Sequence, residues 1–323
     1  METQLKWYHN ICLGGLWWFF LFISVTPRCF RYYILKPFLA LLLILSHYRH
    51  KVIAENLTKS FPEKSKQEIR RLVRRYYIHL AEVAVDIISL VGASEKRKDR
   101  AVNWVNYKDV TDRLNGKDWI AVGAHYGCWE YLPLWSRKQM CNTFMSVYHP
   151  MSSVVFDCFF QRMRRYSENI TTIPMKSTIT YYLRNRSKGK GIILGLLSDQ
   201  SPYLRADTHW FRFLNQDTAF IDGAESIAMK FKIPILFAYT RRVAPGRYEV
   251  VLEEIYDGKE EMAQHEITQR YATRLEEMIR EQPELWMWSH KRWKHTPEGQ
   301  KRRFGSSTLE KQKIHITSTT QWT

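Results

Sequence analysis

Three short apolar runs constrain the fold of this chain more than any other feature of its sequence. They are Trp119–Gly123, Ile192–Leu197 and Ile235–Tyr239, and each is bounded by Gly, Asp or Pro. Such runs are typical of strands that are buried on both faces. Helical segments lie between them, for example Val154–Tyr166 and Ala224–Phe231. Because strands alternate with helices, the sequence predicts an α/β domain in which helices flank a sheet.

Further elements extend this pattern on both sides. Residues Pro62–Ser89 carry apolar side chains at spacings of three and four, which predicts an amphipathic helix. Its other face is basic, suited either to anionic headgroups or simply to water. Tyr248–Leu252 follows Pro245 and Gly246 and predicts a strand that forms a hairpin with Ile235–Tyr239. Residues 261–280 predict a surface helix.

The N-terminal region is apolar. Residues 11–25 carry no charge before Pro27, and residues 37–46 form a second run too short to span a bilayer alone. A signal peptide needs a positively charged start, but the stretch before the first run has one basic residue, Lys6, and one acidic residue, Glu2. No small-x-small cleavage site precedes Pro27, so we expect an uncleaved membrane anchor helix. A buried hairpin of a soluble protein is the alternative. Basic residues beyond the run place the remaining chain on the cytoplasmic side: Arg28, Arg31, Lys36, Arg49 and Lys51.

Charge and composition narrow the partners. The 323 residues carry a net charge of +17, which favours an anionic partner. The 12 Trp, 18 Tyr and 16 Phe favour a membrane surface among such partners. The five cysteines form no CxxC pair, so we expect reduced thiols and no metal site. We divide the chain into an anchor and interfacial helix at 1–50, a catalytic domain at 51–304 and a flexible tail at 305–323.

The segment AVGAHYGCWEY carries the candidate chemistry. It runs from a buried strand into His125, with Glu130 five positions later. Side chains at the carboxyl end of such a strand face a crevice. Residues five apart do not meet on a helix, so the pair needs a turn, which Gly127 offers. A carboxylate on one imidazole nitrogen would leave the other free to take a proton from a hydroxyl.

This segment has two other interpretations. A His and a Glu at this spacing are usually ordinary surface or helix-start residues, so the spacing alone is a weak signal. Cys128 lies inside the segment and suggests a cysteine nucleophile. We reject that role, because an acyl-cysteine needs its own close base and the pattern gives His125 to the acceptor hydroxyl.

Four motifs in order give the chain a specific resemblance. They are HYGCWE at 125–130, FDCFFQRMRRYS at 156–167, LLSDQSP at 196–202 and WMWSHKRWKHTPEG at 286–299. With these, the chain resembles the bacterial lipid A biosynthesis (late) acyltransferases, within the His-x4-Asp/Glu acyltransferases that include glycerol-phosphate acyltransferases. The resemblance extends from the anchor to about residue 300. It implies a glycerol-phosphate-acyltransferase-like sheet and transfer of a fatty acyl chain from an acyl carrier protein thioester to a lipid A precursor hydroxyl, without a cofactor.

The resemblance also suggests roles for individual residues. His125 would be the general base and Glu130 would orient its imidazolium, while Arg165, or its neighbour Arg164, would stabilise the oxyanion. For these arginines, a phosphate contact or a salt bridge is an equal alternative. The remaining predicted site residues would bind substrate: Asp199, Gln200, Lys291 and Arg292. Asp199 and Gln200 would hold sugar hydroxyls or position the loop of the first motif, with helix capping as the alternative for Asp199. For Lys291 and Arg292 the alternative is compensation of a helix dipole.

The sequence leaves competing functions open. One is an acyltransferase of the same superfamily that uses another membrane glycolipid or an aminolipid, and acyl-CoA can replace the carrier protein as donor. A more distant one is a membrane-tethered protein that binds anionic ligands without chemistry. We expect no nucleic-acid partner, because the chain lacks RNP-type aromatic motifs and a recognition-helix pattern. The predicted location is the bacterial inner membrane, with the catalytic domain on its cytoplasmic face.

Overall fold

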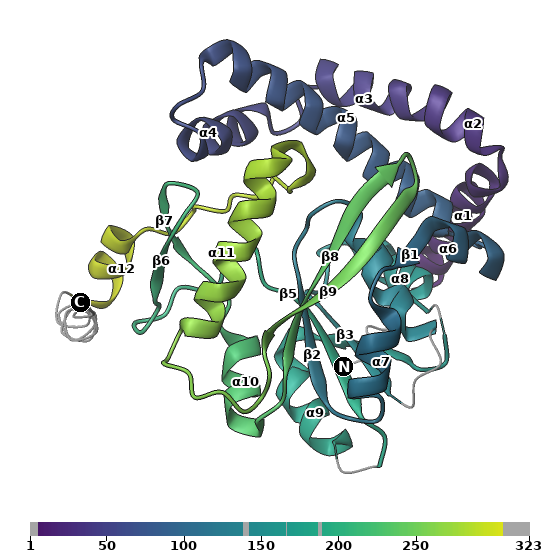
Figure 1. Ribbon diagram of the computed structural model, residues 1–323. Coiled ribbons are helices and arrows are strands. Elements are labelled where there is room, and N and C mark those ends of the chain that lie inside the picture. The colour runs from purple at the N-terminus through teal and green to yellow at the C-terminus, as the bar shows by residue number, and fades with distance from the viewer. Residues whose placement is uncertain (1–5, 138–141, 166, 187–188, 306–323) are drawn as a thin grey trace.

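A seven-stranded sheet forms the centre of the computed structural model, which describes residues 6–137, 142–165, 167–186 and 189–305 (Figure 1). Its strand order is β1-β9-β8-β2-β5-β3-β4, and every pair is parallel except β8 with β9. A separate antiparallel pair joins β6 to β7. The strands are β1 Val102–Trp104, β2 Trp119–Gly123, β3 Thr143–Tyr148, β4 Ile170–Pro174, β5 Ile192–Leu197, β6 Trp210–Phe213, β7 Gln216–Ala219, β8 Ile235–Ala244 and β9 Arg247–Tyr256.

Helices surround the sheet, and in Figure 1 α3, α4 and α5 lie together across one end while α11 runs alongside. The α-helices are α1 Trp7–Val25, α2 Arg28–Phe30, α3 Lys36–Leu45, α4 His50–Ser60, α5 Lys66–Leu90, α6 Glu95–Ala101, α7 Tyr107–Leu114, α8 Val154–Met163, α9 Thr178–Asn185, α10 Gly223–Phe231, α11 Glu266–Glu281 and α12 Pro297–Phe304. Tighter or wider turns form a π-helix, η1 Arg31–Leu35, and the 3₁₀ helices η2 Trp129–Arg137, η3 Met175–Ser177 and η4 Pro283–Leu285.

The predicted α/β arrangement is confirmed, including the β8–β9 hairpin. Helix α5 begins where Ser65 and Glu68 form a capping box, which satisfies backbone N–H groups at the helix start. Two predicted helices are shorter than expected. Helix α8 ends at Met163, and the last predicted residue, Tyr166, lies outside the described residues. Helix α11 begins at Glu266 and buries one face against the core, so it is not only a surface helix. The predicted tail beyond residue 305 also lies outside the described residues.

The two faces of the sheet carry different cores, and β2 shows the division. Ile120 and Val122 pack in the large cluster that includes α5 and α11. The alternate side chains Trp119 and Ala121 belong to a second cluster, together with Trp135 of η2. Because successive strand residues point to opposite faces, one strand serves both cores, which is why its sequence is continuously apolar.

The apolar run predicted as an anchor forms helix α1, and this helix also packs on the domain. Phe20 lies 5.2 Å from Phe159 of α8 between ring centroids, whereas Trp18 and Phe22 are 70% and 72% exposed. Among the described residues, Trp7–Val25 is the one helix that is long and apolar enough to cross a membrane by itself. The bent pair Arg28–Leu45 and His50–Ser60 passes the same test only when taken together. An apolar helix with such an exposed ridge fits an anchor.

A buried carboxyl group joins the N-terminal helices to the sheet. Asp86 of α5 is fully buried and accepts hydrogen bonds from the hydroxyls of Tyr32 and Tyr248, the latter at 2.7 Å. Burial raises the pKa of Asp86 from 3.8 to about 7, with the charge of Glu82 adding to this and the two tyrosine bonds opposing it. The native state therefore holds a proton that the unfolded chain releases at mildly acidic pH.

We expect Asp86→Asn to change how stability depends on pH. For the native protein, the contribution of Asp86 is present below pH 3.8 and is lost as the pH rises to about 7. The slope of unfolding free energy against pH should become less negative in the variant, by at most about 1.4 kcal/mol per pH unit. Denaturant unfolding across this pH range measures the slope. Exposed Asp112→Asn is the matched control, and equal slopes in all three proteins would refute the assignment.

Candidate functional site

A cavity of about 1260 Å³ opens at the carboxyl edge of β2 and β5. The polar residues that line it include His125, Glu130, Arg164, Gln200 and Lys294. We call the part that His125 and Gln200 line, beside the strand ends, its mouth. Its interior follows the sheet face that carries the second core and is mainly apolar. A concave space with a few convergent polar groups and an apolar interior is typical of a site for a small or amphiphilic ligand.

The floor of the apolar interior is built from small residues. Gly123 and Ala121 of β2, Gly195 of β5 and Ala238 of β8 all line the cavity. Their positions are adjacent in the sheet, since Ala121 pairs with Gly195 and Gly123 pairs with Ala238. Small residues on three neighbouring strands therefore leave a slot above the sheet. The side chains of Leu132, Leu197 and Phe144 border it, at 2.9 to 3.0 Å from where Cβ atoms of Gly123 and Gly195 would lie. Larger residues would fill it as they do elsewhere in a close-packed core.

His125 stands directly beyond the end of β2, as the sequence predicts. The chain then turns at Gly127, whose φ of +59° is a conformation that glycine adopts without a Cβ penalty. A Cβ there would lie 2.3 Å from the Thr240 hydroxyl oxygen. The backbone N–H of Gly127 donates to Leu285 O at 3.0 Å, and Met287 N donates to His125 O at 3.0 Å. The histidine loop is thus held from both sides.

Asp199 binds the histidine at two points. Its Oδ1 lies 2.8 Å from His125 Nδ1, and its Oδ2 accepts from the His125 backbone N–H at 3.0 Å and from Trp286 Nε1 at 2.8 Å. Burial opposes ionisation of Asp199, but the charge and hydrogen bonds of His125 and the Trp286 bond outweigh it, so its pKa lies below the ordinary value. A carboxylate so placed fixes the Nδ1–H tautomer and leaves Nε2 as the acceptor.

Gln200 extends this group toward the cavity. Its side-chain nitrogen lies 3.3 Å from His125 Nε2, the nitrogen that Asp199 leaves available. Asp199 and Gln200 follow β5 directly, and β5 lies beside β2 in parallel register. Both residues therefore meet His125 at one edge of the sheet. Of the two roles suggested from sequence for Asp199, positioning of the first motif is the one that the contacts support.

Glu130 is placed differently from the sequence prediction. We expected its carboxylate to orient His125, but Asp199 occupies that position and Glu130 pairs with Arg164. Arg164 Nε donates to Glu130 Oε2 at 2.9 Å, and Nη2 donates to Oε1. The physical reason is that η2 begins at Trp129 and turns the Glu130 side chain toward the end of α8. The buried Glu130 and the fork of Arg164 form a two-point ion pair at the cavity wall.

Besides Asp199, which contacts His125 without lining the cavity, three predicted residues lie outside it. Arg165 is exposed, so of the two neighbouring arginines only Arg164 is in place to act. Lys291 is also exposed and does not line the cavity. Arg292 is 3% exposed, and its Nη2 donates to Ala219 O at 2.7 Å. Burial lowers the pKa of Arg292 to about 10, while the charge of Asp199 opposes this shift. Arg292 therefore supports the site from behind and does not contact a ligand in the cavity.

Sequence reasoning missed other residues of the cavity. His290 and Lys294 line it from the same segment that was predicted through Lys291 and Arg292. Burial, followed by the charge of Arg292, lowers the pKa of His290 to about 4, so this imidazole is neutral at pH 7. The Trp129 ring stands 5.0 Å from the His125 ring between centroids. The signal for His290 and Lys294 was the motif at 286–299. Its side chains follow no regular period, so the sequence does not show which of them face the cavity.

The environment of Cys128 supports the view that it is not a nucleophile. It is fully buried and does not line the cavity. Burial raises the pKa of its thiol well above the ordinary value, and the charges of Asp86 and Glu130 act in the same direction. A thiol in this environment is a small apolar core residue, because the reactive form of cysteine is the thiolate.

The family model described as bacterial lipid A biosynthesis acyltransferase matches residues 6–295. No curated protein matches the chain. Among solved structures, the chain is similar to PlsC, the 1-acyl-sn-glycerophosphate (LPA) acyltransferase from Thermotoga maritima. That similarity has 13% identity and a TM-score of 0.35, and it covers 81% of this chain and 100% of that chain.

Replacement of Gly127 by alanine should disturb the histidine loop. The new Cβ would meet the Thr240 side chain, and the positive φ would be strained for alanine. We expect a loss of roughly 1–3 kcal/mol in unfolding free energy. Denaturant unfolding measures this loss. Gly189→Ala is the control, since Gly189 also has positive φ but has open space around its Cβ position. An equal loss in both variants would mean that contact with Thr240 contributes nothing.

Proposed function

Since this chain belongs to the bacterial lipid A biosynthesis acyltransferase family, we propose that it transfers a fatty acyl chain from an acyl carrier protein thioester to a hydroxyl group of a lipid A precursor. The observation that carries the proposal is the contact between His125 and the buried Asp199 at the mouth of an apolar cavity. A base at the mouth and a hydrocarbon-lined interior suit a reaction between a hydroxyl and an acyl thioester.

The proposed reaction begins with proton transfer to His125. Nε2 removes the proton from the acceptor hydroxyl as its oxygen attacks the thioester carbonyl carbon. Asp199 stabilises the imidazolium that results. The carbon–sulfur bond then breaks, and the imidazolium returns its proton to the leaving thiolate. The products are an ester and a free thiol, and no cofactor is required because the thioester is a co-substrate.

Arg164 is the proposed stabiliser of the oxyanion. Its guanidinium lines the cavity and is fixed by the two-point pair with the Glu130 carboxylate. A cation held in place before the reaction stabilises developing charge without reorganisation. Under this proposal Glu130 is a positioning residue that acts through Arg164, whereas His125 contacts the reacting oxygen. The His-x4-Glu motif then supplies the base and the holder of the cation, and Asp199 orients the base.

The apolar slot is the proposed site of the acyl chain. Its small-residue floor lies along the sheet beneath the cavity, and its walls include Trp119 and Trp135. Each buried methylene contributes about 0.8 kcal/mol, so a long acyl chain gains most of its binding free energy here. The polar mouth, with Gln200 and Lys294, would then contact the sugar or phosphate part of the acceptor.

The N-terminal helices suggest how such a substrate is reached. Apolar side chains of α1 stay exposed on one side of the helix while the other side packs on the domain. We propose association with the bacterial inner membrane, with the domain on the cytoplasmic face, because basic residues follow the apolar helix. The net charge of +17 favours an anionic membrane surface as a partner. A lipid acceptor could then approach the cavity without leaving the membrane interface.

We expect His125→Ala and Asp199→Asn to reduce acyl transfer strongly. Loss of the base should lower kcat by about 10²-fold or more, and Asp199→Asn should do the same by removing the partner of the Nδ1–H tautomer. Purified full-length protein, acyl carrier protein thioester and a tetra-acylated lipid A precursor form the assay, read by mass spectrometry of the lipid. The control is Asp112→Asn, which changes an exposed carboxylate and should leave kcat unchanged.

Two results of that assay would contradict the proposal. If native protein acylates another glycolipid or an aminolipid but not the lipid A precursor, the proposed acceptor is wrong while the base is retained. If acyl-CoA is used and the carrier protein thioester is not, the proposed donor is wrong. Full activity of folded His125→Ala would remove the catalytic mechanism altogether.

Filling the slot should shorten the acyl chain that the protein accepts. Ala121→Leu and Ala238→Leu add side chains to the floor of the cavity. For each methylene excluded from the slot, kcat/KM for long donors should fall about fourfold, whereas short donors should be unaffected. A series of acyl thioesters of increasing length measures this shift. Ala263→Leu, at an exposed position, is the control, and unchanged chain-length preference in both floor variants would place the acyl chain elsewhere.

A further inference from the structure

A second, smaller cavity lies behind η2 and is strongly basic. Its volume is about 500 Å³, and it shares no lining residue with the large cavity. Of its fifteen lining residues, seven are Arg or Lys and none is Asp or Glu. We call it the basic pocket. Excess positive charge without lining carboxylates is unfavourable unless an anion is present, so the composition points to an anionic ligand.

Three separate segments build the basic pocket. Arg28 and Arg31 come from the junction between α1 and α3, Arg97 and Arg100 come from α6, and Arg247 comes from the β8–β9 turn. The segments are joined by direct contacts at this point. Arg28 donates to Pro245 O in the turn, and Arg97 donates to Ser24 O at the end of α1. The cations are therefore gathered by tertiary structure, from positions that are distant in sequence.

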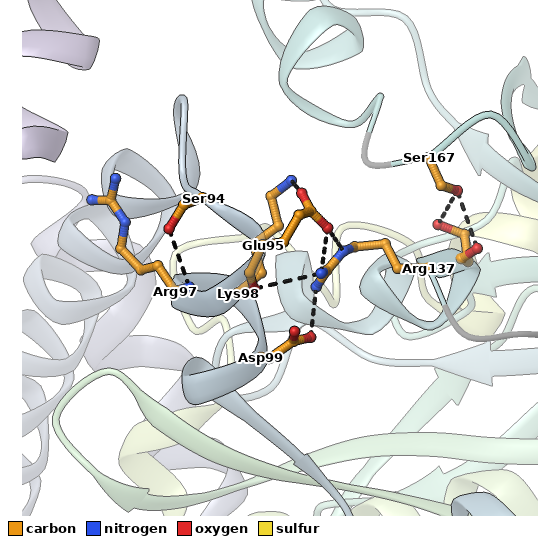
Figure 2. A network of polar contacts seen from close by, with 8 residues as sticks. Ser94, Glu95, Arg97, Lys98, Asp99, Arg137 and Ser167 are labelled. Carbon is orange, nitrogen blue, oxygen red and sulfur yellow. Dashed lines mark hydrogen bonds and ion pairs between the residues drawn. The ribbon is translucent and has the colours of Figure 1, made fainter.

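The nearby carboxylates pair with Arg137 and with one pocket cation, Lys98, as Figure 2 shows. Glu95 accepts from Arg137 Nε at 2.7 Å and from Lys98 at 2.8 Å, and Asp99 accepts from Arg137 Nη1 at 3.1 Å. In Figure 2 the Arg97 side chain points away from this network. Among the described residues, no carboxylate forms an ion pair with Arg28, Arg31, Arg97, Arg100 or Arg247. The nearby Arg137 and Lys98 do form such pairs.

The end of helix α1 explains only part of this cluster. Arg31 Nη1 donates to Ser24 O at 2.6 Å and also to Thr26 O, so these cations cap the last turn of α1. The charge equivalent at a helix C-terminus is about −0.5, far less than the charge of the six pocket cations other than Lys98, which pairs with Glu95. Arg31 is 5% exposed, and its Nε is buried without a hydrogen-bond partner in the described part of the chain. An unsatisfied buried donor on a charged group is costly, which again indicates a missing acceptor.

We propose that the basic pocket is a binding site for a phosphate group, distinct from the cavity at His125. Guanidinium groups bind phosphate by paired hydrogen bonds, and several arginines from different directions match its oxygens better than they match a planar carboxylate. The pocket lies at the end of α1, a helix on which Phe22 and Val25 are 72% and 63% exposed. This position suits the headgroup of an anionic phospholipid whose chains lie along the apolar ridge of α1. Free phosphate has the same chemistry and is separated by experiment.

Binding to vesicles tests the proposal with the full-length protein. The probes are phosphatidylcholine vesicles that contain phosphatidic acid, and phosphatidylcholine vesicles that contain a fatty acid at the same surface charge. Native protein should bind the phosphatidic acid vesicles more tightly. Arg97→Gln with Arg100→Gln should weaken this binding by about tenfold or more, because charge-assisted hydrogen bonds are lost. Arg100→Gln with Arg247→Gln, both at exposed positions, is a second variant that should fold and act in the same direction.

The control variant removes equal charge outside the pocket. Arg71→Gln with Arg75→Gln lies on the exposed face of α5 and should retain the preference for phosphatidic acid. Inorganic phosphate identifies the source of the ligand. If it raises the melting temperature saturably and competes with the vesicles, free phosphate fills the pocket, and if it does neither while vesicle binding persists, the lipid headgroup does.

Several outcomes would overturn the proposal. One is equal binding of native protein to the two kinds of vesicle, together with no saturable effect of inorganic phosphate. Another is an equal loss in the control variant, which would mean that overall charge alone drives binding. A third is competition by polyglutamate but not by phosphate, which would make the pocket part of a surface for an acidic protein. None of these readouts depends on acyl transfer, so the result is independent of the proposed reaction.

Discussion

The buried carboxylate of Asp199 is the interaction on which the site depends. It accepts hydrogen bonds from the side chain and backbone of His125 and from the indole of Trp286, and so it joins the ends of β2 and β5 to the segment that follows α11. A carboxylate that is 2% exposed remains charged only if such donors compensate for lost water. The same bonds that keep Asp199 ionised therefore fix the position and tautomer of the histidine.

The segment at 285–293 holds the histidine loop in place. Leu285 O accepts from Gly127, and the Met287 N–H donates to His125 O. Arg292 lies buried near Asp199, and in the described part of the chain no carboxylate forms an ion pair with it. The negative charge of Asp199 partly offsets the lowering of the Arg292 pKa by burial. The Arg292 guanidinium lies 4.6 Å from the Phe220 ring centroid. Charge, backbone pairing and packing thus act together, so movement of this segment would disturb the base as well as the cavity wall.

The sequence predicted the local structure well and the long-range contacts only in part. The apolar runs gave the central strands, and the strand end with Gly127 placed His125 and its turn. The partner of the imidazole depends on which strand lies beside β2, and hydrophobic pattern does not determine strand order. Which of Arg164 and Arg165 lines the cavity depends on where helix α8 ends, because neighbouring residues point in different directions there. His290 and Lys294 could not be separated from Lys291 and Arg292, because that segment has no regular period.

The alternation along β2 relates the fold to the proposed substrate. Ile120 and Val122 are large and close the core beneath α5 and α11, whereas Ala121 and Gly123 on the opposite face leave room for the slot. Because side chains alternate, volume can be removed from one face without weakening the packing of the other. The parallel register then places that apolar slot directly beneath the strand end that carries His125. A strand with one filled face and one open face thus brings hydrocarbon binding and proton transfer to the same edge, as an amphiphilic substrate requires.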